Sequence, residues 1–193
     1  AATHPHRFTV DDPFDAPPGA WGSAVYSRHP FQSVREVQAP IDDGTVRPAI
    51  EVELRIDDRT VVLQLAHPSP AGRAWRLEKR DAQLLDLSRR VPGEGALRIL
   101  AGDLNVAPTS PVFRRVLRAG ALRDSRRGFG RQPTWRTAEL LPTPSIRSAL
   151  RDLRASWIPI DHVLVGPGIE VVDRWTVLLP GSDHLAVVAD LAW

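Results

Sequence analysis

The sequence predicts an α/β domain with one hydrophobic core. Short apolar runs bounded by turn residues recur along the chain and are typical of buried strands, whereas residues 72–90 and 109–119 have apolar side chains at helical spacing. The length of 193 residues, with 42% hydrophobic and 25% charged residues, is that of a single ordinary globular domain. The sequence has no internal repeat, glycine-rich phosphate loop or serine nucleophile elbow.

Strands make up most of the predicted elements. Residues 1–18 are polar, rich in proline and without a regular period, so they are predicted to be a loop. Asp57 and Asp58 form the turn of a hairpin between two of the strands that follow. The predicted strands are residues 23–27, 34–38, 47–56, 59–66, 97–101, 160–165 and 185–191, and the last two flank residues 169–179.

The first predicted helix covers residues 72–90. Its charged residues, including Arg80, lie largely off the apolar face. Because it links the strand before His67 to the strand before Asp103, the helix is a crossover that places these two strands in one sheet, side by side or nearly so. The apolar face carries Leu77, Leu84, Leu85 and Leu87.

The second predicted helix, over residues 109–119, opens with a proline in its first turn and ends at Gly120. After it, residues 122–135 form a loop rich in arginine and glycine. Residues 138–156 mix proline, leucine and arginine without a clean period and are predicted to be an irregular insertion with one short helix at 145–153.

The strongest candidate for a functional site is Gly102-Asp103-Leu104-Asn105, at the end of a predicted strand. Because side chains alternate along an extended chain, Asp103 and Asn105 point the same way while Leu104 points to the core. A carboxylate and a carboxamide therefore leave one end of a sheet together, where ligands bind in open α/β sheets. A turn in which both side chains bond only their own backbone explains this sequence equally well.

Two later stretches repeat this pattern of polar residues at strand boundaries. Asp161 lies within an apolar strand, and Asp183 and His184 lie between a turn and the last strand. A buried carboxylate or imidazole is costly unless it is paired, so these residues favour a functional site. His162 follows Asp161 and points to the opposite face by alternation, which predicts a structural role. Asp190 is predicted to lie on the surface.

His67 ends a buried strand at a loop bounded by proline, as Asp103 does. A single histidine at a strand end is more often structural. It becomes a candidate here because it shares a sheet end with the other polar residues, and because an imidazole transfers protons near neutral pH.

Charge and composition limit the classes of function. The sequence pI is near 9.9, but the net charge is only +2, and 24 of the 25 basic residues are arginine, which raises the pI without creating a strong field. The basic clusters at residues 73–80, 114–131 and 147–154 are interpreted as solvated helix faces in preference to a phosphate-binding groove. The absence of cysteine excludes disulfides and thiolate sites, and no apolar run reaches the length of a membrane helix.

Together these motifs resemble the endonuclease/exonuclease/phosphatase superfamily, the fold of DNase I. The resemblance rests on Gly102-Asp103-Leu104-Asn105, Ile160-Asp161-His162-Val163 and Ser182-Asp183-His184, in that order, with His67 upstream. Residues 22–30, Arg80 with Gln83, and Pro133-Thr134-Trp135 are supporting matches. It covers residues 21–193 and implies a DNase I-like four-layer sandwich, in which two mixed β-sheets pack face to face with helices outside.

The start of the chain departs from this family. The resemblance implies an opening strand with an asparagine and a second strand ending in a glutamate that is the main metal ligand, but residues 1–20 contain no glutamate and leave no room for two strands. We therefore interpret residues 1–193 as a single domain of this family truncated at its N-terminus, with an uncovered sheet and either marginal stability or pairing with another chain. The resemblance also suggests a bacterial protein in which membrane helices precede an extracytoplasmic catalytic domain.

The resemblance implies a phosphoesterase that uses Mg²⁺ or Mn²⁺. In such a site Asp183 supplies a metal oxygen, and Asp103 with Asn105 holds the attacking water or a second metal. His184, oriented by Asp161, bonds a phosphate oxygen or takes part in activating water. His67 contacts phosphate or protonates the leaving oxygen. The implied partner is an anionic phosphate ester, either a nucleic acid or a lipid head group among others.

Two other readings remain open. A catalytically inactive scaffold of the same fold would act as a binding module. The missing glutamate favours inactivity of these 193 residues, whereas the full set of later Asp and His motifs argues for an active parent protein. A nonspecific basic nucleic-acid binder is disfavoured by the modest net charge and the few aromatic residues. The oligomeric state and the particular ester stay undetermined by the sequence.

Overall fold

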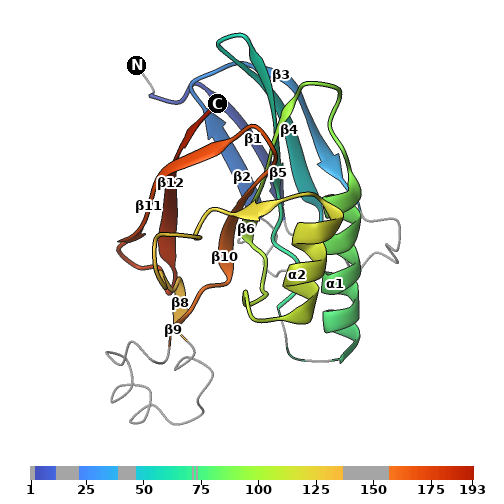
Figure 1. The fold of residues 1–193 in the computed structure, drawn as a ribbon, viewed down its shortest axis with the longest axis vertical. Helices are drawn as coiled ribbons and strands as arrows, with labels where there is room; N and C mark the ends of the chain where they lie inside the picture. Colours follow the sequence, from blue (N-terminus) through green and yellow to red (C-terminus); the bar gives the residue numbers. More distant parts are fainter. Residues whose placement is uncertain (1–2, 12–21, 39–46, 71, 73, 137–156) are drawn as a thin grey trace.

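A six-stranded mixed sheet forms the centre of the structure (Figure 1). The computed structural model describes residues 3–11, 22–38, 47–70, 72, 74–136 and 157–193. The strand order is β3-β4-β5-β6-β10-β7, in which β5 and β6 are parallel and all other neighbours antiparallel. The strands are β3 (Phe31–Val37), β4 (Ala49–Ile56), β5 (Arg59–Leu65), β6 (Leu97–Asp103), β10 (Asp161–Val165) and β7 (Arg123–Asp124).

Two helices, α1 (Ala74–Arg89) and α2 (Pro111–Ala119), cover one face of this sheet (Figure 1). The crossover through α1 makes β5 and β6 adjacent parallel strands, as predicted. In α2, Pro111 occupies the first turn, where its missing N–H is not needed, and the helix ends at Gly120. The buried cluster between the helices and the sheet includes Leu84, Leu87, Leu100, Phe113, Val116 and Leu164.

Antiparallel hairpins form the second layer, on the other face of the sheet. The hairpin of β1 (His6–Asp11) and β2 (Gly22–Ser27) contacts β3, and β12 (Leu185–Ala192), paired with β11 (Glu170–Leu178), contacts β10. The two hairpins therefore cover opposite ends of the six-stranded sheet. A small third pair, β8 (Trp135–Arg136) with β9 (Trp157–Ile158), lies beside β12.

The middle of this second face is less well covered than its ends. On β4, Ile50 and Val52 have no exposed surface, and Val165 on β10 is also fully buried. Between them on β5 and β6, Leu63 and Ile99 remain partly exposed, although both pack against the same cluster. Val61 and Leu97, on the same two strands and in the same cluster, are buried, so the thinner cover among the described residues is limited to the level of Leu63 and Ile99.

The predicted α/β sandwich fold is confirmed. The two described helices lie over one face of the six-stranded sheet, and within the described residues no helix covers the outer side of the hairpins. Neither helix combines the length and hydropathy needed to cross a bilayer.

The N-terminal loop prediction is wrong for residues 6–11, which form β1 and pair with β2 in register from His6 and Ser27 to Asp11 and Gly22. The segment does alternate, because Phe8 and Val10 pack against the core while Arg7, Thr9 and Asp11 are exposed. Prolines on both sides obscured a period that is only six residues long.

The face assigned to the first helix is wrong at two positions. Leu77 is exposed, whereas Arg80 is buried at 7% exposure. The guanidinium of Arg80 is retained inside because it donates to the carbonyl of Asn105 at 2.7 Å and to Asp81 at 2.9 Å. A buried charge is tolerated when its hydrogen bonds are satisfied, and hydrophobic periodicity does not register such pairs.

The arginine- and glycine-rich segment 122–135 is mostly loop, as predicted, but it also contributes β7 and the first residue of β8. On α2, Arg114, Arg115 and Arg118 are exposed, as expected for a solvated helix face. The insertion predicted at 138–156, with its helix at 145–153, lies outside the described residues.

Candidate active site

Three strands bring polar side chains together at one end of the central sheet, where β5 and β6 finish and β10 begins. Because β5 and β6 are parallel, with Leu65 opposite Ala101, His67 and Asp103 emerge at the same edge. The antiparallel strand β10 begins there, and its first residue, Asp161, is directly opposite Asp103. Strand pairing alone therefore places two carboxylates and an imidazole together.

Thr134 joins this edge to the last strand. It is fully buried, and its hydroxyl accepts the backbone N–H groups of Ile160 at 3.0 Å and Asp161 at 3.1 Å. Its own carbonyl accepts the N–H of Leu185 at 2.7 Å, and the next residue, Trp135, forms a β-bridge with His184. One buried threonine thus ties the start of β10 to the start of β12, which brings His184 beside Asp161.

The side chains at this junction form a tight cluster. Nδ1 of His184 lies 2.8 Å from Oδ2 of Asp161, and Nε2 of the same ring lies 3.9 Å from Oδ2 of Asp103. His67 also approaches that oxygen, with its Nε2 at 3.7 Å. One ligand atom each from Asp103, Asp161 and His184 lies within 4.8 Å of the other two.

Asn105 holds the loop after β6 in shape. Its φ of +51° is in the left-handed region, which asparagine adopts more readily than most residues. Its N–H donates to Oδ1 of Asp103 at 2.9 Å, and its side-chain amide donates to the carbonyl of Pro68 at 3.0 Å. With Arg80 bonded to its carbonyl, Asn105 links the loop after β5 to the loop after β6.

All six residues singled out in the sequence line one open pocket of about 400 Å³. Asp183 lines it from an exposed position and stands outside the three-residue cluster. Trp135 and Ile160 contribute apolar surface to the same pocket. The six are His67, Asp103, Asn105, Asp161, Asp183 and His184.

Three aspartates, Asp103, Asp161 and Asp183, line the pocket and make it negatively charged. Burial, together with the charge of Asp161, raises the pKa of Asp103 to about 6. Burial disfavours the charged form of His184, but its hydrogen bond to Asp161 and the charges of the three aspartates outweigh burial, so the pKa of His184 is raised. The site therefore favours cations.

His162 points away from the pocket, as alternation predicts. It is 1% exposed, its Nε2 lies 2.8 Å from the carbonyl of Val106, and its ring packs on Phe113 at 4.6 Å between centroids. Burial lowers its pKa, so it is a neutral core histidine. Asp190 is exposed, as expected.

Sequence reasoning missed Arg47, whose Nη1 lies 3.3 Å from Nε2 of His67. The side-chain amide of Gln83, on α1, donates to the backbone carbonyl of Arg47 at 2.6 Å. The hairpin turn at Asp57 and Asp58 could have predicted this contact. If the pairing of the two strands is continued away from the turn, the residues before β4 lie beside the residues after β5.

The sequence profile of the Endonuclease/Exonuclease/phosphatase family matches residues 2–184. This chain belongs to that family. The resemblance in the three ordered motifs is therefore confirmed at the level of the family, and the pocket they form is this family member's candidate active site.

Solved structures support the same fold. An endonuclease/exonuclease/phosphatase from Beutenbergia cavernae DSM 12333 is 24% identical with a TM-score of 0.74, over 98% of this chain and 54% of that one. A Neisseria 3′ phosphatase, solved with a product DNA hairpin, is 19% identical with a TM-score of 0.67, over 97% and 80%. A mannosyl-6-phosphatase from Bacteroides thetaiotaomicron VPI-5482 is 17% identical with a TM-score of 0.61, over 98% and 78%. This chain thus spans about half the length of the first of these.

A comparison with curated proteins finds no match. The three solved structures are all less than 25% identical to this chain, so they establish its fold and leave its substrate to experiment.

The residues of the pocket fit a hard divalent cation. Their donor set is rich in carboxylate oxygen, which Mg²⁺ and Mn²⁺ prefer. The raised pKa of Asp103 shows that its charge is poorly compensated by the surrounding protein, and a cation would supply that compensation. Asp161 already accepts a hydrogen bond from His184, which leaves Asp103 as the better placed of the two carboxylates to bind the cation.

Proposed function

We propose that this family member is a divalent-cation-dependent phosphoesterase that hydrolyses a phosphodiester or a phosphomonoester. The observation that carries the proposal is the cluster of Asp103, Asp161 and His184 in an open pocket, with His67 on its rim. Family membership supports phosphoester hydrolysis at the level of the family.

In this proposal Asp103, Asn105 and Asp183 hold Mg²⁺ or Mn²⁺. Asp103 and Asn105 are already fixed relative to one another by the hydrogen bond from the N–H of Asn105 to Oδ1 of Asp103. A cation bound by these residues supplies Lewis-acid polarisation of the phosphate and neutralises charge on its oxygens.

Asp161 and His184 handle the proton. Nδ1 of His184 donates to Asp161, so the ring is oriented with Nε2 toward the pocket and toward Asp103. In that position His184 either hydrogen-bonds a phosphate oxygen or takes the proton of the attacking water. His67, whose Nε2 lies 3.7 Å from Oδ2 of Asp103, contacts phosphate or protonates the leaving oxygen.

The proposed substrate class is an anionic phosphate ester, and the particular ester is open. The Neisseria neighbour is a 3′ phosphatase bound to DNA, and the Bacteroides neighbour is a mannosyl-6-phosphatase, so proteins of this fold act on different esters. The test set is therefore DNA, RNA, sphingomyelin, phosphoinositides, mannose 6-phosphate, p-nitrophenyl phosphate and bis(p-nitrophenyl) phosphate.

The decisive experiment measures turnover of this set by the 193-residue chain with Mg²⁺, with Mn²⁺ and with EDTA. We expect hydrolysis of at least one ester with a divalent cation and none with EDTA. Because residues 1–20 contain no glutamate, this expectation requires Asp103, Asn105 and Asp183 to hold the cation without that ligand. His184→Ala and Asp183→Ala should each reduce the rate by more than about tenfold, equivalent to ~1.4 kcal/mol in the barrier, without unfolding the chain.

Asp190→Ala is the matched control, because Asp190 is an exposed aspartate on β12, the strand that follows His184. It should retain the full rate. Hydrolysis that is unaffected by EDTA would contradict the cation requirement. Binding of an ester by the wild-type chain without turnover under any condition would indicate the inactive binding scaffold instead.

A further inference from the structure

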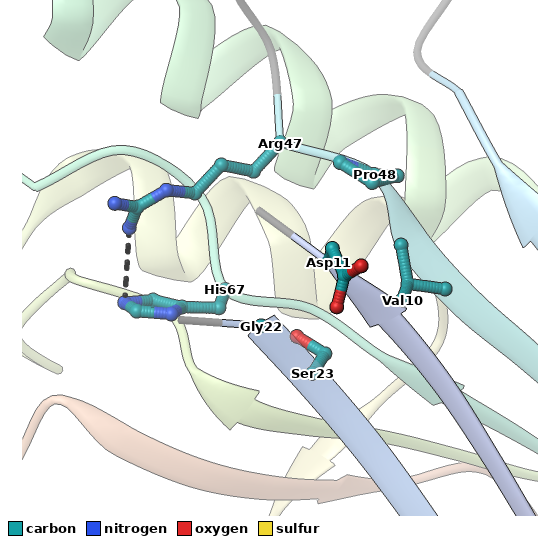
Figure 2. Close-up of a pocket in the computed structure, with 7 residues that line it drawn as sticks. All are labelled: Val10, Asp11, Gly22, Ser23, Arg47, Pro48 and His67. Atoms are coloured by element: carbon teal, nitrogen blue, oxygen red, sulfur yellow. Dashed lines mark hydrogen bonds between the residues drawn. The ribbon is translucent and has the colours of Figure 1, made fainter. Parts of the chain in front are cut away.

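Arg47 stands next to His67, in a small notch that shares His67 with the pocket. Figure 2 shows the two side chains pointing toward one another, with the dashed line joining Nη1 of Arg47 to Nε2 of His67. The distance is 3.3 Å. Arginine has only donors, so the ring nitrogen accepts in this contact.

We propose that Arg47 binds the phosphate group of the ester, beside His67. The proposal deepens the proposed function and rests on it. The guanidinium of Arg47 would bind the non-bridging oxygens of the phosphate group.

The first support is the rigid placement of the Arg47 backbone. Pro48 is buried directly after it, and β4 then pairs with β5 from Ile50 to Ile56. The carbonyl of Arg47 accepts the amide N–H of Gln83 at 2.6 Å, and Gln83 is only 2% exposed. A residue anchored through its backbone presents its side chain at a defined place, which lowers the entropic cost of binding a ligand.

The same helix anchors the opposite rim of the pocket. Arg80, three residues before Gln83, donates to the carbonyl of Asn105 at 2.7 Å. Two buried side chains on one face of α1 therefore hold the backbones of Arg47 and Asn105. Arg47 belongs to the same rigid frame as the metal-ligand candidates.

The second support is charge. His67 lines both the 400 Å³ pocket and a neighbouring notch, which is lined by Val10, Asp11, Gly22, Ser23, Arg47, Pro48 and His67. Among the described residues that line these two spaces, Arg47 is the only lysine or arginine, and four of the others are aspartates. The divalent cation of the proposed function offsets part of this negative charge for an entering phosphate ester, and Arg47 adds a positive charge that is fixed on the protein.

Arginine also has the right shape for this ligand. Its planar guanidinium presents parallel N–H groups that match two oxygens of a phosphate, an arrangement that a lysine ammonium does not reproduce. The contact with His67 directs the guanidinium toward the rim on which His67 stands.

The notch itself fixes the side from which the phosphate arrives. Its volume is about 10 Å³, which is room for about one water molecule. Asp11 and Ser23 lie on its far side from Arg47 (Figure 2). A phosphate group is too large for this space, so it reaches Arg47 from the 400 Å³ pocket, where Asp103 and His184 are.

The test combines kinetics with a binding measurement that needs no turnover. Inorganic phosphate is titrated into the EDTA-treated chain and followed by calorimetry, and KM and kcat are measured with p-nitrophenyl phosphate and bis(p-nitrophenyl) phosphate. Arg47→Ala and Arg47→Gln should each weaken phosphate binding and raise KM by about tenfold or more. Arg47→Lys should recover part of the binding, because it keeps the positive charge but lacks the parallel N–H groups of the guanidinium.

Arg55→Ala is the control, because Arg55 is an exposed arginine near the far end of β4, the strand that Arg47 precedes. It should bind phosphate as the wild type does. Folding of each variant is checked by circular dichroism, and Gln83 should retain its bond because it contacts only the backbone of residue 47.

Each outcome is decisive. Wild-type phosphate affinity in Arg47→Ala, or a loss of kcat with KM and phosphate binding unchanged, would show that Arg47 only supports His67 and would overturn the proposal. Failure of the wild type to bind phosphate would overturn it too. If the wild type hydrolyses no ester but binds phosphate through Arg47, the proposed function fails while the anion site stands.

Discussion

The imidazole of His184 and the carboxylate of Asp161 meet through a 2.8 Å hydrogen bond, although 23 residues separate them along the chain. The contact fixes the ring with Nδ1 protonated and Nε2 toward Asp103. It also places negative charge where a positive imidazolium is favoured, which is one cause of the raised pKa of His184.

Asp161→Asn should therefore reduce kcat by about 10²- to 10⁴-fold. The neutral amide has nearly the same shape but removes the charge, so the pKa of His184 should fall. The measurements are kcat and the pH titration of the His184 ring protons by NMR. Asp190→Asn is the control. An unchanged His184 titration in Asp161→Asn would contradict this account of the pair.

The hydroxyl of Thr134 should be required to hold the start of β10 in place at the site. In Thr134→Val the shape is retained, but the N–H groups of Ile160 and Asp161 lose their acceptor inside the protein. Each buried unsatisfied donor costs about 1–3 kcal/mol, so we expect a loss of roughly 2–5 kcal/mol in the free energy of unfolding. Thr134→Ser keeps the hydroxyl and should lose much less. Urea unfolding of the two variants distinguishes these outcomes, and equal stability would refute the assignment.

The metal-free chain should become less stable as the pH rises from about 4 to 6. The pKa of Asp103 is 3.8 in its ordinary state and about 6 in the folded protein, so between these values the folded state binds more protons than the unfolded state. Its stability must then fall with rising pH, by about 3 kcal/mol in total for this group. His184 acts in the same direction at higher pH, because its raised pKa gives a contribution that is lost as the ring deprotonates.

Thermal unfolding in EDTA between pH 4 and 7.5 measures this dependence. The difference between wild type and Asp103→Asn isolates the contribution of Asp103, and Mg²⁺ should remove most of the fall by binding the ionised carboxylate. A difference curve that is flat with pH would show that Asp103 is not the group responsible.

Gly102 should tolerate no side chain. Its φ is +134°, and a Cβ would stand 2.1 Å from the carbonyl oxygen of Ala66 on the neighbouring segment. Gly102→Ala must therefore separate the ends of β5 and β6, and we expect a loss of about 3 kcal/mol or more in stability. Gly93→Ala, where a Cβ meets nothing within 4 Å, should be close to neutral. Comparable melting temperatures for the two variants would contradict the expected clash.

The sequence predicts the site better than it predicts the surroundings of the site. Asp103 and Asp161 could be placed because alternation and strand ends are local properties of the chain. The crossover helix was enough to set His67 beside Asp103, since a parallel pair needs no knowledge of distant contacts. The polar residues that the sequence places at strand boundaries therefore lie together in the structure.

Arg80 and Arg47 show where such reasoning ends. Both are arginines that a hydrophobic pattern assigns to solvent or ignores, and both are positioned by hydrogen bonds to residues 25 and 20 positions away. Likewise, Arg174 on β11 is 2% exposed and bonds Ser125, 49 residues away. Pairings of this kind depend on tertiary contacts, which no local period encodes.

Because the described residues cover Leu63 less completely than Val52, a charged side chain should be tolerated differently at these two positions. A lysine in place of Val52, which is fully enclosed, has no route to water and should prevent folding. At Leu63, on the next strand in the same row, the long side chain can extend its ammonium into solvent, so the same replacement should leave a folded chain. Among the described residues, the position of Leu63 is thus more permissive to a new polar side chain than that of Val52, its neighbour on β4.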